Sequence, residues 1–230
     1  MRLTILAAIA LSVSAASAVA DNSKFFVEVY KYAYAEPSVM TKDSEIGFIG
    51  LGYQNYGAQD EDGIISTARL FIGTTKYAST STGTTTDDLT TGFSSEVAYK
   101  KESFFVGLGY RYLFDKWGDK QSSTGAYTYN RKSQYLYMPV GIIRYNEKGG
   151  YLKTQFNYLL GGTQTSYLTR PGYTTTTNKQ KSGYGLEVEY APNSKYSIFA
   201  KHWSINKSTI NNGLYEPNNT TNEFGVKIKF

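Results

Sequence analysis

The clearest pattern in the chain is a strict alternation of apolar and polar residues near its C-terminal end. Residues 222–230 read Asn-Glu-Phe-Gly-Val-Lys-Ile-Lys-Phe. Successive side chains of a strand point to opposite faces, so this segment predicts a strand with one apolar face and one polar face. The same alternation recurs in residues 103–114, 151–160 and 182–190.

Ten segments of the chain have the character of strands. We place them at 24–35, 44–56, 64–76, 91–101, 103–114, 134–145, 150–166, 182–191, 195–206 and 221–230. Short connections with turn-forming residues are expected at 57–63, 101–102, 146–149 and 191–194. Longer loops are expected at 36–43, 77–90, 115–133, 167–181 and 207–220. Short turns on one rim and long loops on the other are typical of transmembrane β-barrels.

The polar faces of these segments favour a narrow tube over a globular core. They combine glycine, which leaves space, with long charged side chains that can pair across a lumen. The mean hydropathy of −0.40 agrees with this, because barrel strands alternate lipid-facing and lumen-facing residues. We therefore predict an all-β fold, a transmembrane antiparallel up-and-down β-barrel of 10 strands. Eight strands would follow if 64–76 and 91–101 are misread, and twelve would require splitting a loop.

The alternation also assigns a set of charged residues to the lumen. The candidates are Glu28, Arg69, Glu96, Lys100, Arg111, Arg144, Lys153, Glu187, Glu189, Lys227 and Lys229. Buried charges must be paired or hydrated, and a barrel this small is filled largely by its own side chains. We therefore expect at most a narrow pore, and the basic excess of the set predicts a weak preference for anions.

The first twenty residues have the three-part pattern of a secretory signal peptide. Met1 and Arg2 give a positive start, residues 3–16 are apolar or small, and Ala18-Val19-Ala20 resembles a cleavage site. The sequence thus predicts a signal peptide at 1–20 and a barrel domain at 21–230. The alternative is an anchor helix, because residues 3–20 are about long enough to span a bilayer.

Composition adds two constraints. The chain has 22 Tyr and 12 Phe residues, and tyrosine suits the membrane–water boundary because its ring is apolar and its tip is polar. The formal charge of +5 is scattered along the chain without a basic run, so we expect no nucleic-acid partner. There is no cysteine, so disulfides do not contribute to stability.

The signal peptide, the terminal Phe230 and the Tyr-Leu-Tyr-Met-Pro-Val-Gly segment at 135–141 resemble the small outer-membrane β-barrel superfamily, often labelled porin-family proteins and including barrels of the OmpA and OmpX type. The resemblance covers the chain from residue 21 in architecture, but it includes no functional motif. It implies location in the outer membrane of a Gram-negative cell, in contact with lipid and lipopolysaccharide. It also implies that the last strand, ending on Phe230, is the signal read by the barrel-assembly machinery.

His202 is the single histidine and the most evident candidate for catalysis. A hydrolase would need a nucleophile or a carboxylate beside it, and Ser204, Asp87 and Asp88 are conceivable partners. The simpler interpretation is a boundary histidine beside Trp203. Residues 60–63, Asp-Glu-Asp-Gly, lack the spacing of a calcium loop, and no Cys/His cluster would hold zinc or iron, so we expect no metal and no cofactor.

The sequence therefore favours a non-enzymatic integral outer-membrane barrel with a structural or surface-interaction role. A dedicated small-solute channel and an outer-membrane hydrolase that uses His202 remain as alternatives. Polar loops rich in Ser, Thr and Asn, at 79–91, 171–180 and 206–222, are solvated or carry an interaction surface whose ligand the sequence does not identify.

Overall fold

The computed structural model of the chain describes residues 23–59, 61–118, 120–168, 174–211 and 213–230. The signal peptide expected at 1–20 lies outside these residues. Within them, no helix is long and apolar enough to cross a bilayer. The strands are β1 (Ser23–Glu36), β2 (Met40–Asn55), β3 (Gly63–Ser79), β4 (Gly83–Lys101), β5 (Phe104–Lys116), β6 (Asn130–Tyr145), β7 (Tyr151–Tyr167), β8 (Thr176–Gln180), β9 (Gly183–Ala191), β10 (Tyr196–Ile205) and β11 (Asn219–Lys229).

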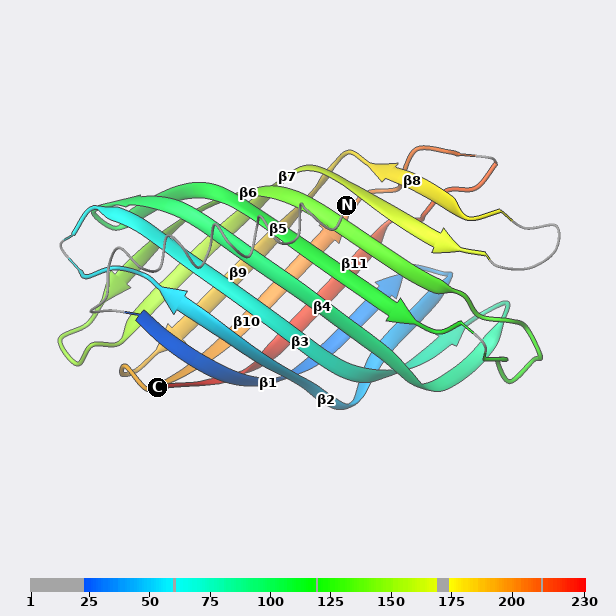
Figure 1. Ribbon diagram of the computed structural model, residues 1–230, viewed down its shortest axis with the longest axis horizontal. Helices are drawn as coiled ribbons and strands as arrows, with labels where there is room; N and C mark the ends of the chain where they lie inside the picture. Colours follow the sequence, from blue (N-terminus) through cyan, green and yellow to red (C-terminus); the bar gives the residue numbers. More distant parts are fainter. Residues whose placement is uncertain (1–22, 60, 119, 169–173, 212) are drawn as a thin grey trace.

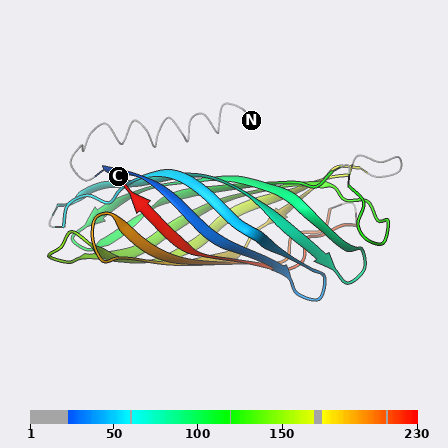
Figure 2. The same cartoon turned by 90° about the horizontal axis from the view of Figure 1, so that it is seen from below.

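Ten of these strands close an antiparallel barrel (Figures 1 and 2). Closure is made by β1 and β11, which pair in register from Phe26↔Lys229 to Ala35↔Thr220. The short β8 is not an eleventh strand of the barrel wall. It pairs with the outer part of β7, while β9 pairs with the part of β7 from Tyr151 to Tyr158. The prediction of a ten-strand barrel is confirmed, and the alternatives of eight and twelve are excluded.

The two rims differ as expected. The start of β1 and the end of β11 lie at the rim with the short turns, where Phe25 and Phe230 exchange backbone hydrogen bonds of 3.1 and 2.9 Å. The turn before β7 is closed by Gly149, which donates its backbone N–H to the carbonyl oxygen of Asn146 and adopts φ 70°. That left-handed conformation favours glycine. We call this rim the inner rim and the opposite one the outer rim.

The expected outer loops are too long in four places, one of them 115–133, of which β5 and β6 leave only residues 117–129. Strands β3 and β4 extend to Ser79 and from Gly83, so most of the segment 77–90 is a hairpin and not a loop. Likewise, β1 and β2 leave only residues 37–39 between them, and β8 occupies part of 167–181. These outer ends are rich in threonine and serine. They lack apolar alternation, which is the signal that identifies a half-buried strand from sequence.

Pro139 disturbs the sheet locally, as its missing N–H predicts. The ladder between β5 and β6 is interrupted between the pairs Val106↔Val140 and Gly109↔Tyr137. On the other side of β6, the register shifts by one residue at Leu136 and Tyr137. The irregularity stays within one region of the wall and does not prevent closure.

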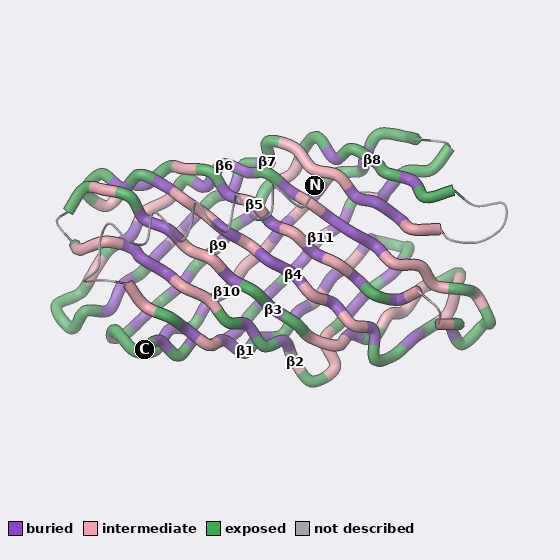
Figure 3. The backbone as a smooth tube through the Cα atoms, viewed as in Figure 1, coloured by how far each residue is buried: buried purple, intermediate pink, exposed green. Residues whose placement is uncertain are grey.

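Burial alternates along the strands in register around the barrel (Figure 3). In β11, every second residue from Asn219 to Lys229 is buried. The outward residues of the middle of the wall are apolar, for example Leu51, Leu70 and Val226, with exposed fractions of 59%, 58% and 49%. The inward face is polar, charged or aromatic, so the barrel is inverted relative to a water-soluble protein.

Inward glycines make room for aromatic rings. A Cβ atom at Gly73 would lie 2.2 Å from Cδ1 of Phe48, and one at Gly109 would lie 2.2 Å from Cε2 of Tyr137. These rings therefore lie directly over the glycine backbone of a neighbouring strand. This close approach lets a narrow barrel hold many aromatic side chains.

The Phe48–Gly73 contact gives a test of this packing. We expect Gly73→Ala to destabilise the folded barrel by about 1–3 kcal/mol, because the new methyl group forces the Phe48 ring out of place. Equilibrium unfolding in urea, in detergent micelles or liposomes, measures the difference. Gly63→Ala is the matched control, because a Cβ at Gly63 has no neighbour within 4 Å. Equal stability of the two variants would contradict the role assigned to Gly73.

Candidate functional site

The lumen holds a central network of ion pairs. Arg69 lies at its centre, where its Nε donates to Glu28 and its Nη1 lies 2.8 Å from Oε2 of Glu223. Glu223 also accepts from Nη2 of Arg111 at 3.1 Å. One carboxylate of the last strand thus joins arginines from β3 and β5, across the inside of the barrel.

Two further groups of ion pairs lie around Glu187 and Glu189 of β9. Members of both groups line the same cavity as Arg69 and Glu223, and we call the three groups together the central network. Glu187 lies 3.1 Å from Nζ of Lys153 and 3.0 Å from Nζ of Lys201, and Lys153 also lies 3.7 Å from Glu96. Glu189 lies 2.6 Å from Nζ of Lys227 and also accepts hydrogen bonds from the hydroxyl groups of Tyr56, Tyr151 and Ser197.

The charges of the central network balance. It contains the acids Glu28, Glu96, Glu187, Glu189 and Glu223 and the bases Arg69, Arg111, Lys153, Lys201 and Lys227. Five acids therefore face five bases, and the basic excess inferred from the sequence is absent from this part of the lumen.

A separate ion-pair network fills the outer part of the lumen. Arg131 lies 2.8 Å from Glu36 and 3.1 Å from Asp115, and Asp115 also pairs with the fully buried Lys42. All four residues lie inside the segments 36–43 and 115–133, which were expected to be loops, so they were not predicted to face the lumen.

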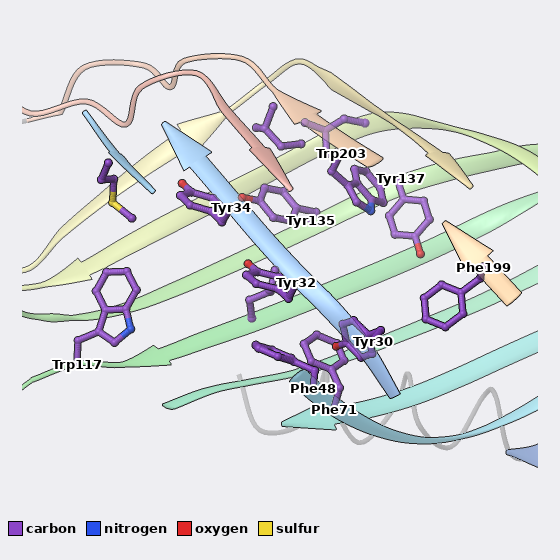
Figure 4. Packing of buried hydrophobic residues seen from close by; sticks show 14 residues of the cluster. Tyr30, Tyr32, Tyr34, Phe48, Phe71, Trp117, Tyr135, Tyr137, Phe199 and Trp203 are labelled. Carbon is purple, nitrogen blue, oxygen red and sulfur yellow. The ribbon is translucent and has the colours of Figure 1, made fainter. Parts of the chain in front are cut away.

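A cluster of buried aromatic side chains lies inside the barrel (Figure 4), and several of its rings contact the networks. The guanidinium of Arg69 lies 4.5 Å from the ring centroid of Tyr30 and 4.7 Å from that of Phe71. Arg131 lies 4.6 Å from the ring of Tyr34 and 5.0 Å from that of Trp117. Such cation–π contacts partly replace the water that a guanidinium loses on burial.

Little free space remains in the lumen. The cavity bordered by Arg69, Glu96, Arg111 and Glu187 has a volume of about 30 Å³, room for very few water molecules. Glu28 Oε2 and Arg69 Nη2 are buried without a protein partner, which suits contact with such water. This cavity is too small for an aqueous channel or an organic ligand.

The structure places ten of the eleven expected lumen residues inside the barrel. Eight of them are members of the central network: Glu28, Arg69, Glu96, Arg111, Lys153, Glu187, Glu189 and Lys227. Lys100 and Lys229 lie near the inner rim, where Lys100 donates to the carbonyl oxygen of Ala58 and Lys229 lies 3.1 Å from the Tyr151 hydroxyl.

Arg144 differs from the expectation. It is exposed on the outer surface, because Ile143 occupies the inward position and is only 1% exposed. Near its end β6 reads Gly-Ile-Ile-Arg-Tyr, with apolar residues on both faces of the strand. The alternation therefore did not show which of these residues point into the lumen. Conversely, Glu223 and Lys201 were omitted from the set, although Glu223 shares the face of Lys227 and Lys229 in the strict alternation of β11.

The loop after β10 packs against β8 and the outer end of β7. Backbone groups of Ser208 and Glu216 bond to each other, and Asn178 of β8 donates to the carbonyl oxygens of Thr209 and Leu214. The carboxyl of Glu216 accepts from Ser166 of β7 at 3.0 Å. Burial raises the pKa of the Glu216 carboxyl above its usual value, since Arg131 only partly offsets the lost hydration.

The remaining candidates do not belong to the central network. His202 faces outward on β10. Asp88 is buried on β4 and lies 3.1 Å from Nζ of Lys120, so it is not a partner of His202. Asp62 accepts from the backbone N–H of Glu102 at 2.7 Å and thus joins two inner turns. Asp60 lies outside the described residues, and in the described part of the chain no cluster of acids and histidines could hold a metal ion.

Comparison with known proteins gives a similar architecture without a functional match. No family model matches the chain, and no curated protein matches its sequence. The chain is structurally similar to small outer-membrane β-barrels. The outer-membrane protease OmpT from Escherichia coli aligns with a TM-score of 0.44 and 12% identity, covering 90% of this chain and 96% of that one.

Two further structures align in the same way. Neisserial surface protein A gives a TM-score of 0.41 and 10% identity over 91% of this chain and 100% of that one. An outer membrane channel from Pseudomonas putida aligns with a TM-score of 0.49 and 11% identity, covering 93% of this chain and 97% of that one. No residue role is carried over from these proteins.

Removing the shared acid of the central network tests how much the barrel depends on it. We expect Glu223→Gln to destabilise the fold by about 3–5 kcal/mol, because two buried guanidinium groups lose their common anion. Urea unfolding followed by tryptophan fluorescence measures the change. The control is Glu147→Gln in an exposed inner turn, which should stay within about 0.5 kcal/mol of the parent chain. A stable Glu223→Gln barrel would mean that the network is dispensable.

Proposed function

We propose that this chain is an integral outer-membrane β-barrel of a Gram-negative cell, exported by cleavage of residues 1–20, with a sealed lumen and a structural or surface-interaction role. One observation carries the proposal: the outward face is apolar while the inward face holds paired charges. In water this arrangement would expose a continuous apolar surface, whereas a lipid environment favours it.

Aromatic residues support the same orientation. A girdle of exposed rings surrounds the inner rim: Phe25, Tyr99, Phe104, Tyr190, Tyr196 and Phe230. Exposed aliphatic side chains follow along the strands, and Tyr158 and Tyr184 lie farther toward the outer rim. Belts of this kind lie at the two boundaries of a membrane. Phe230 is 69% exposed at the end of β11, as suits recognition by the assembly machinery, and lipid and lipopolysaccharide are the other partners that we propose.

A charge in the aliphatic belt tests membrane insertion. We expect Leu70→Arg to lower the stability of the barrel in phospholipid vesicles by about 2–4 kcal/mol, because Leu70 would lie near the bilayer midplane. Thr41→Arg is the control, since Thr41 is exposed at the outer end of β2. Folding is followed by the change of gel mobility on boiling and by urea titration. Equal stability of both variants, with the protein recovered in the soluble periplasmic fraction, would contradict the membrane location.

A narrow, weakly anion-preferring pore is the second candidate. It is favoured by Lys100 and Lys229, which place basic groups near the inner rim without belonging to the balanced network. Against it stands the small size of the free space in the lumen.

Planar-bilayer recording of the refolded chain under a salt gradient separates the two candidates. For the sealed barrel we expect no stable unitary current. The triple variant Tyr30→Ala, Phe48→Ala and Phe71→Ala should conduct, because it removes packed rings from the lumen. Stable unitary steps with an anion-selective reversal potential in the unmodified chain would support the pore, and cation selectivity would contradict both candidates.

A further inference from the structure

The outward face of the wall carries a bonded pair of polar side chains where lipid is expected. Nδ1 of His202 on β10 lies 2.8 Å from Oδ1 of Asn222 on β11. The two residues are directly opposite each other in the ladder. With the asparagine oxygen as acceptor, Nδ1 carries the proton and Nε2 of His202 is left as a base.

Ser204 lies on the same face of β10 as His202. Ser204 is two residues beyond His202 on β10, and residues two apart in a strand point to the same side. His202 and Ser204 are both half-buried, whereas the intervening Trp203 is buried in the lumen. Thr220 of β11 is the ladder partner of Ser204, so a second hydroxyl group adjoins the first.

An apolar groove leads away from His202 along the wall. It has a volume of about 380 Å³ and is lined in part by Ala33, Leu186, Val188, Ala200 and Phe224. The groove forms because Ala33 and Ala200 have small side chains, whereas neighbouring outward positions have large ones. Lys31 is an exposed lining residue, and its Nζ donates to the carbonyl oxygen of Glu45 at 3.3 Å. An apolar trough with an exposed cation in its lining fits a long acyl chain whose lipid carries an anionic headgroup.

We propose that Ser204, His202 and Asn222 form a hydrolytic site for acyl esters of membrane lipids, with the acyl chain in the groove. This inference rests on the membrane location proposed above, because the site faces outward. A nucleophile, a base and a group that orients the base are the parts that acyl transfer requires. Asn222 supplies the orienting group that the sequence did not reveal, since β10 and β11 meet only in the folded ladder.

The reaction proceeds in two steps. The Ser204 hydroxyl oxygen attacks the ester carbonyl carbon as Nε2 of His202 takes its proton. The bond to the alcohol oxygen then breaks, and that oxygen receives the proton from His202. Water attacks the resulting acyl-serine, passing a proton through His202 back to the Ser204 oxygen, which releases the fatty acid. The sum is ester and water giving acid and alcohol, with no change of oxidation state.

Hydrolysis by the refolded barrel tests the proposal. The protein is incubated with vesicles of phosphatidylglycerol and phosphatidylethanolamine, or with purified lipopolysaccharide, and released fatty acid is measured by mass spectrometry. Release from either lipid supports the site, and the two arms identify which lipid is the source. We expect His202→Ala to lower the rate by about 10²- to 10⁴-fold and Ser204→Ala to abolish acyl-enzyme formation.

Folding and background are controlled with a matched variant. Thr91→Ala removes a hydroxyl from the wall of β4, in a groove without a histidine, and should leave the rate unchanged. Every variant must retain the gel shift of the folded barrel. A hexadecyl sulfonyl fluoride probe should form a covalent bond to the Ser204 oxygen with loss of fluoride. A folded, vesicle-inserted barrel that releases no fatty acid from either lipid would overturn the site while leaving the barrel proposal intact, and so would activity that survives in Ser204→Ala.

Asn222 is a positioning residue, and its role has a separate signature. Asn222→Ala should lower kcat by about 10-fold or more with little change of KM, because it frees the His202 ring without altering the groove. Asn222→Asp keeps an acceptor oxygen and should restore most of the rate. Ala200→Phe fills the groove and should instead raise KM. Equal rates for Asn222→Ala and the parent chain would remove Asn222 from the site.

Discussion

Charged side chains that enter the inside of a narrow barrel lose bulk water, and they are tolerated only when each finds an opposite charge or an equivalent partner. This constraint governs the interior of the protein. The central network places five carboxylates against five basic groups, drawn from strands on all sides of the lumen. Because Glu223 joins Arg69 to Arg111, the last strand is tied to the third and the fifth across the lumen. The network thus stabilises closure in a way that backbone pairing between neighbours cannot.

Pairing at this density requires a small cross-section, which the glycines provide. Phe48 and Tyr137 lie against the backbone of adjacent strands because Gly73 and Gly109 have no side chain. The rings of Tyr30 and Phe71 lie against the guanidinium of Arg69, and all four rings occupy space in the lumen that water would otherwise fill. Lower local polarity strengthens each correct pair and penalises each unpaired charge. Aromatic packing and charge pairing therefore depend on each other, and together they leave little room for a pore.

The barrel, its strand number and most of its lumen were predictable from sequence. In a half-buried strand, apolar and polar residues alternate because successive side chains face different environments. Glu187 and Glu189 illustrate this, since each is flanked by apolar residues that face outward. The prediction was weak where the environment does not alternate. At the outer ends of the strands the outward residues are polar as well, so the buried Lys42 and Asp115 were assigned to loops. Near the inner rim apolar residues occupy both faces of β6, so the sequence did not show that Ile143 points inward and Arg144 outward. Contacts between strands are a further gap: the pairing of His202 with Asn222 depends on register, which one sequence does not specify.

A filled lumen also restricts where chemistry can occur. A ligand can reach the chain only at the outer mouth, at the inner turns, or laterally from the bilayer. On the lipid-facing wall, polar groups are disfavoured unless they bond to each other, as His202 and Asn222 do. The bonded pair packs against Tyr184 and lies on the same face as Ser204, at the end of a trough that small residues open. This position allows lateral access, because a lipid ester diffusing in the membrane plane would meet Ser204 without crossing the barrel, and the acyl chain would remain in an apolar environment throughout.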